Sequence, residues 1–213
     1  MMKNATLAPV SRLRNAVLLA VLGASLLSAC APLLVGGAMV GGAMVAVDRR
    51  TTGTQVEDEA IELKAGSRGR EVSPAGHINV TSYNRMVLLS GEVPNEVDRK
   101  AVEQVAGKVE NVRSVLNELA VAGNSALGVR SSDSLISGKV KAAFIDAKDL
   151  QSQAIKVVTE RGVVYLMGMV TEREATRASD LARTVSGVQK VVRVFELISE
   201  TELAALQSKL APR

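Results

Sequence analysis

Cys30 is the only cysteine of the 213-residue chain, so it carries the only thiol. It follows the small residues Ser28 and Ala29 at the end of an apolar run, residues 16–27, and the segment before that run is basic. The basic residues are Lys3, Arg12 and Arg14. This order of charge, apolar run and small residues is typical of a secretory signal. A lone thiol in an oxidising compartment has no disulfide partner, so the pattern predicts covalent modification of the Cys30 sulfur.

The ending Leu27-Ser28-Ala29-Cys30 resembles the lipobox of bacterial lipoproteins. The resemblance implies a signal peptide at residues 1–29, cleavage before Cys30, a diacylglyceryl group on its sulfur and acylation, as with palmitate, of the new amino terminus. Several acyl chains on one residue give stable anchoring to a membrane. Ala31 in place of Asp implies, by the same resemblance, the outer membrane of a Gram-negative bacterium, with the chain facing the periplasm. Two alternatives stay open: a soluble secretory signal with an incidental cysteine, and an uncleaved membrane helix, for which about a dozen apolar residues are short.

The rest of the chain offers few groups for catalysis. His77, the only histidine, stands at the entrance to a predicted strand, which favours a surface or structural role. The acidic pairs Asp58-Glu59 and Glu172/Glu174 are interpreted as helix-start and solvent-facing charges. The sequence has no nucleophile elbow, no phosphate-binding glycine loop and no His/Cys metal spacing. It therefore predicts a protein that is not an enzyme and that holds no metal and no cofactor.

The charge balance argues against nucleic acid as a partner. Of 26 Lys and Arg residues, the three in the signal leave with it, so 23 basic residues face 22 acidic ones in the mature chain. Nucleic-acid binders concentrate basic residues on one face, and an exported protein would not meet nucleic acid.

Two segments of the chain repeat each other. Val87, Leu89 and Gly91 align with Val164, Leu166 and Gly168 in a predicted second strand. Each repeat has a first strand, a polar turn (Asn84-Arg85 or Arg161-Gly162), the second strand, a helix and a third strand. A helix is also predicted upstream of each repeat, from about residue 55 to 65 and from about 132 to 145. The predicted fold class is α+β, with two helices on one face of a three-stranded mixed sheet in each unit.

This order of elements resembles the BON domain. The resemblance rests on the Gly-x-Val end of the second strand and on a Val-x-x-Val signature, Val112 to Val115 and Val188 to Val191, before the third strand. Two such domains behind a lipobox resemble the tandem BON-domain lipoproteins of Gram-negative bacteria that are associated with cell division and outer-membrane stress. The resemblance implies a non-enzymatic protein that binds anionic phospholipid, supports envelope integrity and has envelope or division proteins as partners.

The repeats and the resemblance together predict how the chain is divided into segments. The predicted segments are a signal peptide at 1–29, a lipidated Gly-rich apolar tether at 30–47, BON domains at 48–122 and 131–198, a linker at 123–130, and a C-terminal helix or tail at 199–213. The tether contains Gly-Gly-Ala-Met-Val twice, and the alternative is a segment that lies in or crosses the bilayer.

The predicted helix from residue 132 to 145 has two apolar stripes. On a helical wheel, Ile136, Val140, Ala143 and Phe144 form the stripe that should face the sheet. A second stripe lies roughly opposite and is flanked by two lysines, as a helix that binds a membrane surface requires. The predicted lipid-binding residues are Leu135, Gly138, Lys139, Lys141, Ala142 and Ile145. The alternative is that this stripe packs on the first domain or on the C-terminal helix.

Charge favours the second domain for this role. Residues 48–122 contain 10 basic and 12 acidic residues, whereas residues 131–198 contain 10 and 8. The upstream helix of the first domain is acidic and shows no second apolar stripe, so unequal lipid binding by the two domains is expected.

A rival function is a protein-interaction or assembly module of the cell envelope or of a secretion system. Its candidate surface is the apolar face formed by Val163, Tyr165, Met167 and Met169. Both faces of this second strand are apolar, although helices can cover only one. We therefore also expect the open faces of the two sheets to pack together, with Met86 and Leu88 supplied by the first domain.

Overall fold

The structure is a computed structural model that describes residues 48–210, with side chains as far as Ser208. The predicted signal peptide, Cys30 and the tether lie outside the described residues. The described chain belongs to one compact unit that spans Val45–Arg213.

The first domain is a mixed sheet with two helices. Its elements are α2 (Thr52–Val72), β1 (His77–Tyr83), β2 (Met86–Val93), α3 (Glu96–Gly107), β3 (Ser114–Asn117) and β4 (Ala120–Val121). β1 pairs antiparallel with β2, while β3 and β4 both pair parallel with β2. The third strand of the repeat is thus formed in two pieces.

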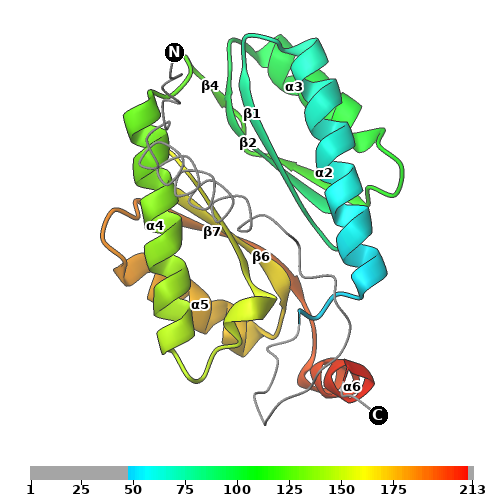
Figure 1. The fold of residues 1–213 in the computed structure, drawn as a ribbon, viewed down its shortest axis with the longest axis vertical. Helices are drawn as coiled ribbons and strands as arrows, with labels where there is room; N and C mark the ends of the chain where they lie inside the picture. The colour runs from blue at the N-terminus through cyan, green and yellow to red at the C-terminus, as the bar shows by residue number, and fades with distance from the viewer. Residues whose placement is uncertain (1–47, 211–213) are drawn as a thin grey trace, which may run out of the picture. The chain divides into compact units, whose positions relative to one another are not determined.

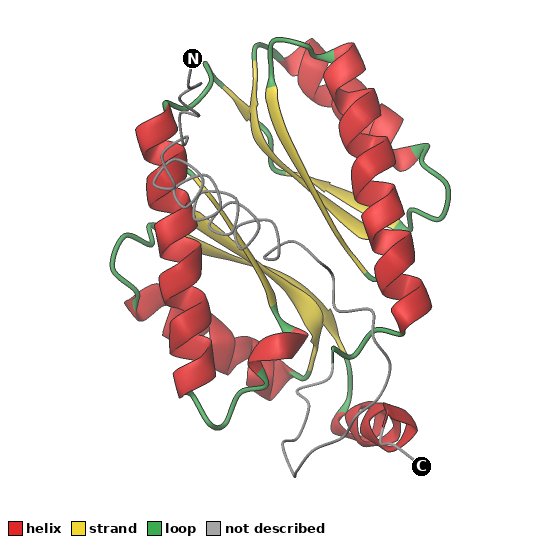
Figure 2. Cartoon of the chain, in the orientation of Figure 1, coloured by secondary structure: helices red, strands yellow, loops and turns green. Residues whose placement is uncertain are grey.

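The second domain repeats this arrangement. Its elements are α4 (Leu127–Asp146), the 3-10 turn η2 (Ser152–Ala154), β5 (Lys156–Glu160), β6 (Val163–Val170), α5 (Glu172–Thr184) and β7 (Lys190–Leu197). β6 lies between antiparallel β5 and parallel β7. Helices α2 and α3 cover one face of the first sheet, and α4 and α5 cover one face of the second (Figures 1 and 2). The predicted α+β fold is confirmed.

The helices differ from the predictions mainly at their ends. α2 continues to Val72 because Gly66 and Gly69, which weaken a helix in solvent, are buried against neighbouring side chains here. α4 begins at Leu127, so residues 127–130 of the expected linker are helical. After the second domain, α6 (Glu200–Leu210) forms where a helix or tail was expected.

Each β-hairpin turns through two residues with positive φ. These are Asn84 (49°) and Arg85 (66°) in the first domain, and Arg161 (52°) and Gly162 (74°) in the second. Two consecutive residues in this region match the right-handed twist of the flanking strands. The predicted polar turns are therefore confirmed, although three of the four residues have a side chain that disfavours the conformation.

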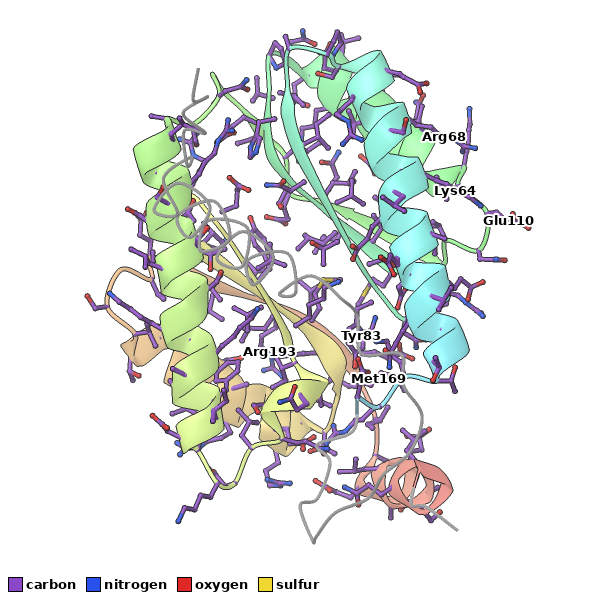
Figure 3. The ribbon with its side chains drawn as sticks, in the orientation of Figure 1. Lys64, Arg68, Tyr83, Glu110, Met169 and Arg193 are labelled. Atoms are coloured by element: carbon purple, nitrogen blue, oxygen red, sulfur yellow. The ribbon has the colours of Figure 1, made fainter. Side chains whose placement is uncertain are left out.

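Each domain has its own aliphatic core between sheet and helices, and a third cluster joins the two domains. The third cluster contains the buried residues Tyr83, Leu88, Tyr165, Met167 and Val194, with Met86, Val163 and Met169 packed against it. Tyr83 and Met169 lie side by side in this region (Figure 3). The expectation that the open faces of the two sheets pack together is confirmed.

Polar contacts surround this shared cluster. Asn79 donates to Glu160 and Asn84 donates to Glu196, each at 2.7 Å. Lys156 Nζ lies 2.6 Å from Glu62 Oε1. Because these pairs join the first domain to the second, they fix the orientation in which the apolar faces meet.

Candidate membrane-binding surface

α4 has one buried and one exposed apolar side. Ile136, Val140 and Phe144 belong to the core of the second domain. On the other side, the side chains of Leu135 and Ile145 are 67% and 66% exposed. Because the sheet covers only one side of the helix, these two large apolar residues contact water.

All six residues predicted to bind lipid lie on the exposed side of α4. Gly138, Lys139, Lys141 and Ala142 are exposed together with Leu135 and Ile145. No heavy atom lies within 4 Å of a Cβ built on Gly138. The alternative, in which this stripe packs on the first domain or on the C-terminal helix, is therefore wrong, while lipid binding itself stays a prediction.

The exposed stripe is longer than the sequence suggested. Leu127, at the first turn of α4, is 79% exposed. At 100° per residue it lies on the same side of the helix as Gly138 and Ile145. From Leu127 to Ile145 the stripe runs about 27 Å along the helix axis. Sequence reasoning missed Leu127 because it placed this residue in a linker.

The two lysines stand on opposite edges of the stripe. On the helical wheel, Lys139 lies beyond Leu135 on one edge, and Lys141 lies beyond the line of Leu127 and Ile145 on the other. Both are exposed. The surface therefore combines an apolar strip with a positive charge on each side, an arrangement suited to an interface between headgroups and acyl chains.

α2, the corresponding helix of the first domain, also exposes apolar side chains. Val56 is 63% and Leu63 is 69% exposed. The expectation that α2 shows no second apolar stripe is therefore wrong. The stripe holds only these two residues over two turns, and the exposed Glu59 lies near them on the helix. Acidic Glu59 and basic Lys64 both lie near it, so the border of this short stripe is mixed in charge.

Each BON-like repeat has a buried aspartate that binds the backbone of its hairpin turn. Asp58 accepts hydrogen bonds from the backbone N–H groups of Asn84 (2.8 Å) and Arg85 (2.7 Å), at the hairpin turn. In the second domain, Asp133 accepts from the N–H groups of Arg161 and Gly162, both at 2.8 Å. Each aspartate thus ties the domain's first helix to its hairpin. Both lie three residues before a core isoleucine, Ile61 or Ile136, and this spacing was a usable signal.

Hydrogen bonding controls the ionisation of these buried carboxylates. Burial alone would raise the pKa of Asp58, but hydrogen bonds from Ser82, Arg85 and Arg50 outweigh it and hold the pKa below its usual value. The same balance lowers the pKa of Glu174, where burial is outweighed by Arg49 and by the backbone N–H of Thr171. Both groups are therefore charged and bonded in the folded protein, and the solvent-facing interpretation of Asp58 and Glu174 is wrong.

His77 lies at the start of β1, as predicted, but two carboxylates accompany it. Its Nδ1 is 3.3 Å from Glu92 Oε2 and 4.0 Å from Glu160 Oε1. A cavity of about 400 Å³ opens beside this group, between α4 and β5. Its lining includes Arg130, Ser134, Ser137 and Lys141. This cluster could not be predicted from the sequence, because its members are far apart along the chain.

Within residues 48–210, no helix is both long and apolar enough to cross a membrane.

The sequence matches one known domain family twice. The profile of the BON domain matches residues 58–123 and 132–198. The chain belongs to the BON-domain family. The second match begins at residue 132, inside α4, so Leu135 and Ile145 lie within the matched range and Leu127 lies just before it.

Several curated proteins are similar over most of the chain. The outer membrane lipoprotein DolP of Haemophilus influenzae is 39% identical over 91% of this chain and 99% of its own length. The 21 kDa hemolysin of Actinobacillus pleuropneumoniae is 32% identical over 71% of this chain and 80% of its own. The osmotically-inducible protein Y of Escherichia coli is 30% identical over 65% of this chain and 72% of its own.

Proposed function

We propose that this protein is a non-enzymatic outer membrane lipoprotein whose second BON domain binds anionic phospholipid through α4. The lipid anchor is assigned to Cys30, and the chain faces the periplasm, where it supports envelope integrity. The end-to-end similarity to an outer membrane lipoprotein supports this location and anchor. Envelope or division proteins are proposed as further partners.

The observation that carries the membrane role is the exposed apolar stripe of α4. Leu127, Leu135 and Ile145 are large apolar side chains with nothing packed over them. Complete transfer of one such side chain from water contributes roughly 1.5 to 3 kcal/mol. Three of them along one helix face are enough to hold a protein at a membrane that it already reaches through an anchor.

The lysines give the preference for anionic lipid. Each basic residue close to an anionic leaflet contributes about 1 kcal/mol, and this contribution falls within a Debye length. Lys139 and Lys141 border the stripe on opposite edges, so both can reach headgroups while the leucines enter the interface. Binding should therefore weaken as salt increases, without vanishing.

The apolar face of β6 that suggested the rival assembly function is not available to another protein. Tyr165 and Met167 are buried against the first domain, and Val163 and Met169 pack beside them. A subunit interface through this face would require the two BON domains to separate. Assembly with other proteins would have to use another surface.

Vesicle co-sedimentation of residues 45–213 separates the two functions. We expect binding to vesicles of phosphatidylglycerol and phosphatidylethanolamine, and little binding to vesicles of phosphatidylcholine alone. The fragment lacks Cys30, so an acyl anchor cannot produce the result. Absence of binding to both kinds of vesicle, together with oligomers that form as concentration rises, would favour the assembly function.

A further inference from the structure

The side chains of His77, Glu92 and Glu160 meet at one corner between the two BON domains. One ligand atom from each lies within 4.8 Å of the other two. His77 and Glu92 belong to β1 and β2 of the first domain, and Glu160 ends β5 of the second. An imidazole nitrogen and two carboxylates are ligands that divalent transition metals accept.

The inner atoms of this corner have no hydrogen-bond partner. Glu92 is fully buried, and Ser125 donates to its Oε1, while its Oε2 has no hydrogen-bond partner. His77 Nδ1, 3.3 Å from that oxygen, is also buried and without a hydrogen bond. A buried carboxylate oxygen that faces a ring nitrogen needs a proton or a cation between them.

The third carboxylate is oriented in the same way. Asn79 donates to Glu160 Oε2 at 2.7 Å, and Glu160 Oε1 lies 4.0 Å from His77 Nδ1. In metal sites, hydrogen bonds to the outer atoms of the ligands hold them in position for the ion. Here each carboxylate has one oxygen held by a protein donor and the other directed toward the imidazole.

We propose that His77, Glu92 and Glu160 form a site for a divalent transition-metal ion such as Zn²⁺, which clamps the two BON domains together. Bonds of about 2.0 to 2.2 Å place two ligands of a tetrahedral zinc ion about 3.4 Å apart. The pair at 3.3 Å fits this spacing, and the more distant atoms close by about 1 Å when the ion binds. The adjacent cavity gives the ion an entrance and supplies water as the fourth ligand.

The charges at the site also suit a divalent cation. When both carboxylates are ionised they carry two negative charges, which one divalent ion neutralises. Arg161 Nη1 lies 3.6 Å from Glu92 Oε1 and opposes the ion, but its side chain is 47% exposed and can turn to solvent. Nitrogen coordination favours zinc, copper or nickel over magnesium and calcium, which prefer oxygen alone.

Zinc titration of the full-length chain in detergent tests the proposal. The chain carries Cys30→Ala, which removes its only thiol, and EDTA strips it of metal first. We expect one zinc ion per chain by calorimetry, and at least about tenfold weaker binding in His77→Ala and in Glu160→Gln. Glu196→Gln is the matched control, because Glu196 also accepts a 2.7 Å hydrogen bond from an asparagine of the other domain. This control should bind zinc as tightly as the parent chain.

Two further readouts report the site directly. Because the chain has one histidine, its imidazole nitrogen resonances are unambiguous, and zinc should shift Nδ1 far more than Nε2. Zinc should also raise the melting temperature of the parent chain and of Glu196→Gln, but not of Glu160→Gln. Glu92→Gln is not used, because Glu92 is completely buried and its replacement would also disturb folding. Equal zinc affinity in His77→Ala, unchanged ring resonances, or no binding at millimolar zinc would each overturn the proposal.

Discussion

Arg49 donates hydrogen bonds to both carboxylate oxygens of Glu174, at 2.8 Å from Nη1 and 2.7 Å from Nη2. Arg49 precedes α2, the first helix of the first BON domain, and Glu174 lies in the first turn of α5 in the second. Arg49 also donates to the backbone carbonyl of Met169 at 2.7 Å. The segment that enters the first domain is therefore attached to the second domain, 125 residues away.

Glu174→Gln should lower the free energy of unfolding by about 3 kcal/mol, because it leaves the buried Arg49 guanidinium without its ion pair. Urea denaturation of residues 45–213 measures this change. The control is Glu172→Gln, two residues earlier, where an exposed carboxylate pairs with Arg193 and the loss should be small. Equal stability of the two variants would contradict the structural role of the Arg49–Glu174 pair.

Stability should fall in acid partly through Asp58. Its folded-state pKa lies below the ordinary value of 3.8, so the stabilisation is fully present above that value and is lost as the pH falls through the folded pKa. Asp58→Asn should be less stable than the parent at neutral pH and should lose less further stability below about pH 4. Unfolding midpoints measured from pH 7 to pH 2 test this, and parallel curves for both chains would refute it.

Leu135→Glu should weaken binding to anionic vesicles and leave the melting temperature nearly unchanged. The variant loses roughly 1.5 to 3 kcal/mol of apolar insertion at the membrane and places a carboxylate beside anionic headgroups. Ile136→Glu should do the opposite and unfold the second domain, because it buries a charge in the core. Co-sedimentation and thermal unfolding of both variants separate the two effects.

The matched control for Leu135 is Leu63 on α2, which is 69% exposed. Leu63→Glu should leave vesicle binding unchanged, because the first domain is not expected to contact lipid. Lys139→Glu should act in the same direction as Leu135→Glu, with a stronger dependence on salt. If Leu135→Glu binds vesicles as well as the parent does, the α4 stripe is not the lipid surface.

Cys30→Ala should abolish lipidation, because the chain has no other thiol to accept the lipid. Cells grown with radioactive palmitate should label the parent protein and not the variant. The variant should stay uncleaved or be released from the membrane. Label that persists on the variant would disprove the anchor assignment.

The second BON domain expressed alone should be less stable than the tandem chain. Separation exposes Tyr165 and Met167, which lie in the cluster shared with the first domain. Each large apolar side chain that returns to water costs roughly 1.5 to 3 kcal/mol. Thermal unfolding of residues 123–213 and of residues 45–213 makes the comparison, and equal midpoints would show that the shared cluster contributes little.

Most of the fold could be predicted because it depends on local patterns that occur twice. The repeated apolar runs identified β2 and β6, and the two apolar stripes of α4 were visible from spacing alone. The start of α4 was missed because Gly123, Asn124 and Ser125 have the composition of a loop and no side chain caps the helix at Ala126. Local pattern therefore predicts where a helix lies better than where it begins.

The buried polar groups could not be predicted in the same way. Asp58 and Glu174 resemble surface residues until their partners are known, and Arg49 is remote in sequence from Glu174. The meeting of His77 with Glu160 depends on how the two domains pack, which neither repeat encodes by itself. Long-range polar contacts of this kind become visible only when the whole chain is folded.

The bond between Arg49 and Glu174 also bears on how the protein is made. Synthesis starts at the amino terminus, so Arg49 is made long before its partner Glu174. The apolar face that includes Tyr83 and Leu88 likewise stays exposed until β6 has been made. A chain that stops before β6 would expose an unpaired guanidinium and an apolar sheet face together. An incomplete chain would thus expose features that a protease or chaperone can recognise. In the complete chain, the guanidinium and the apolar face are both buried.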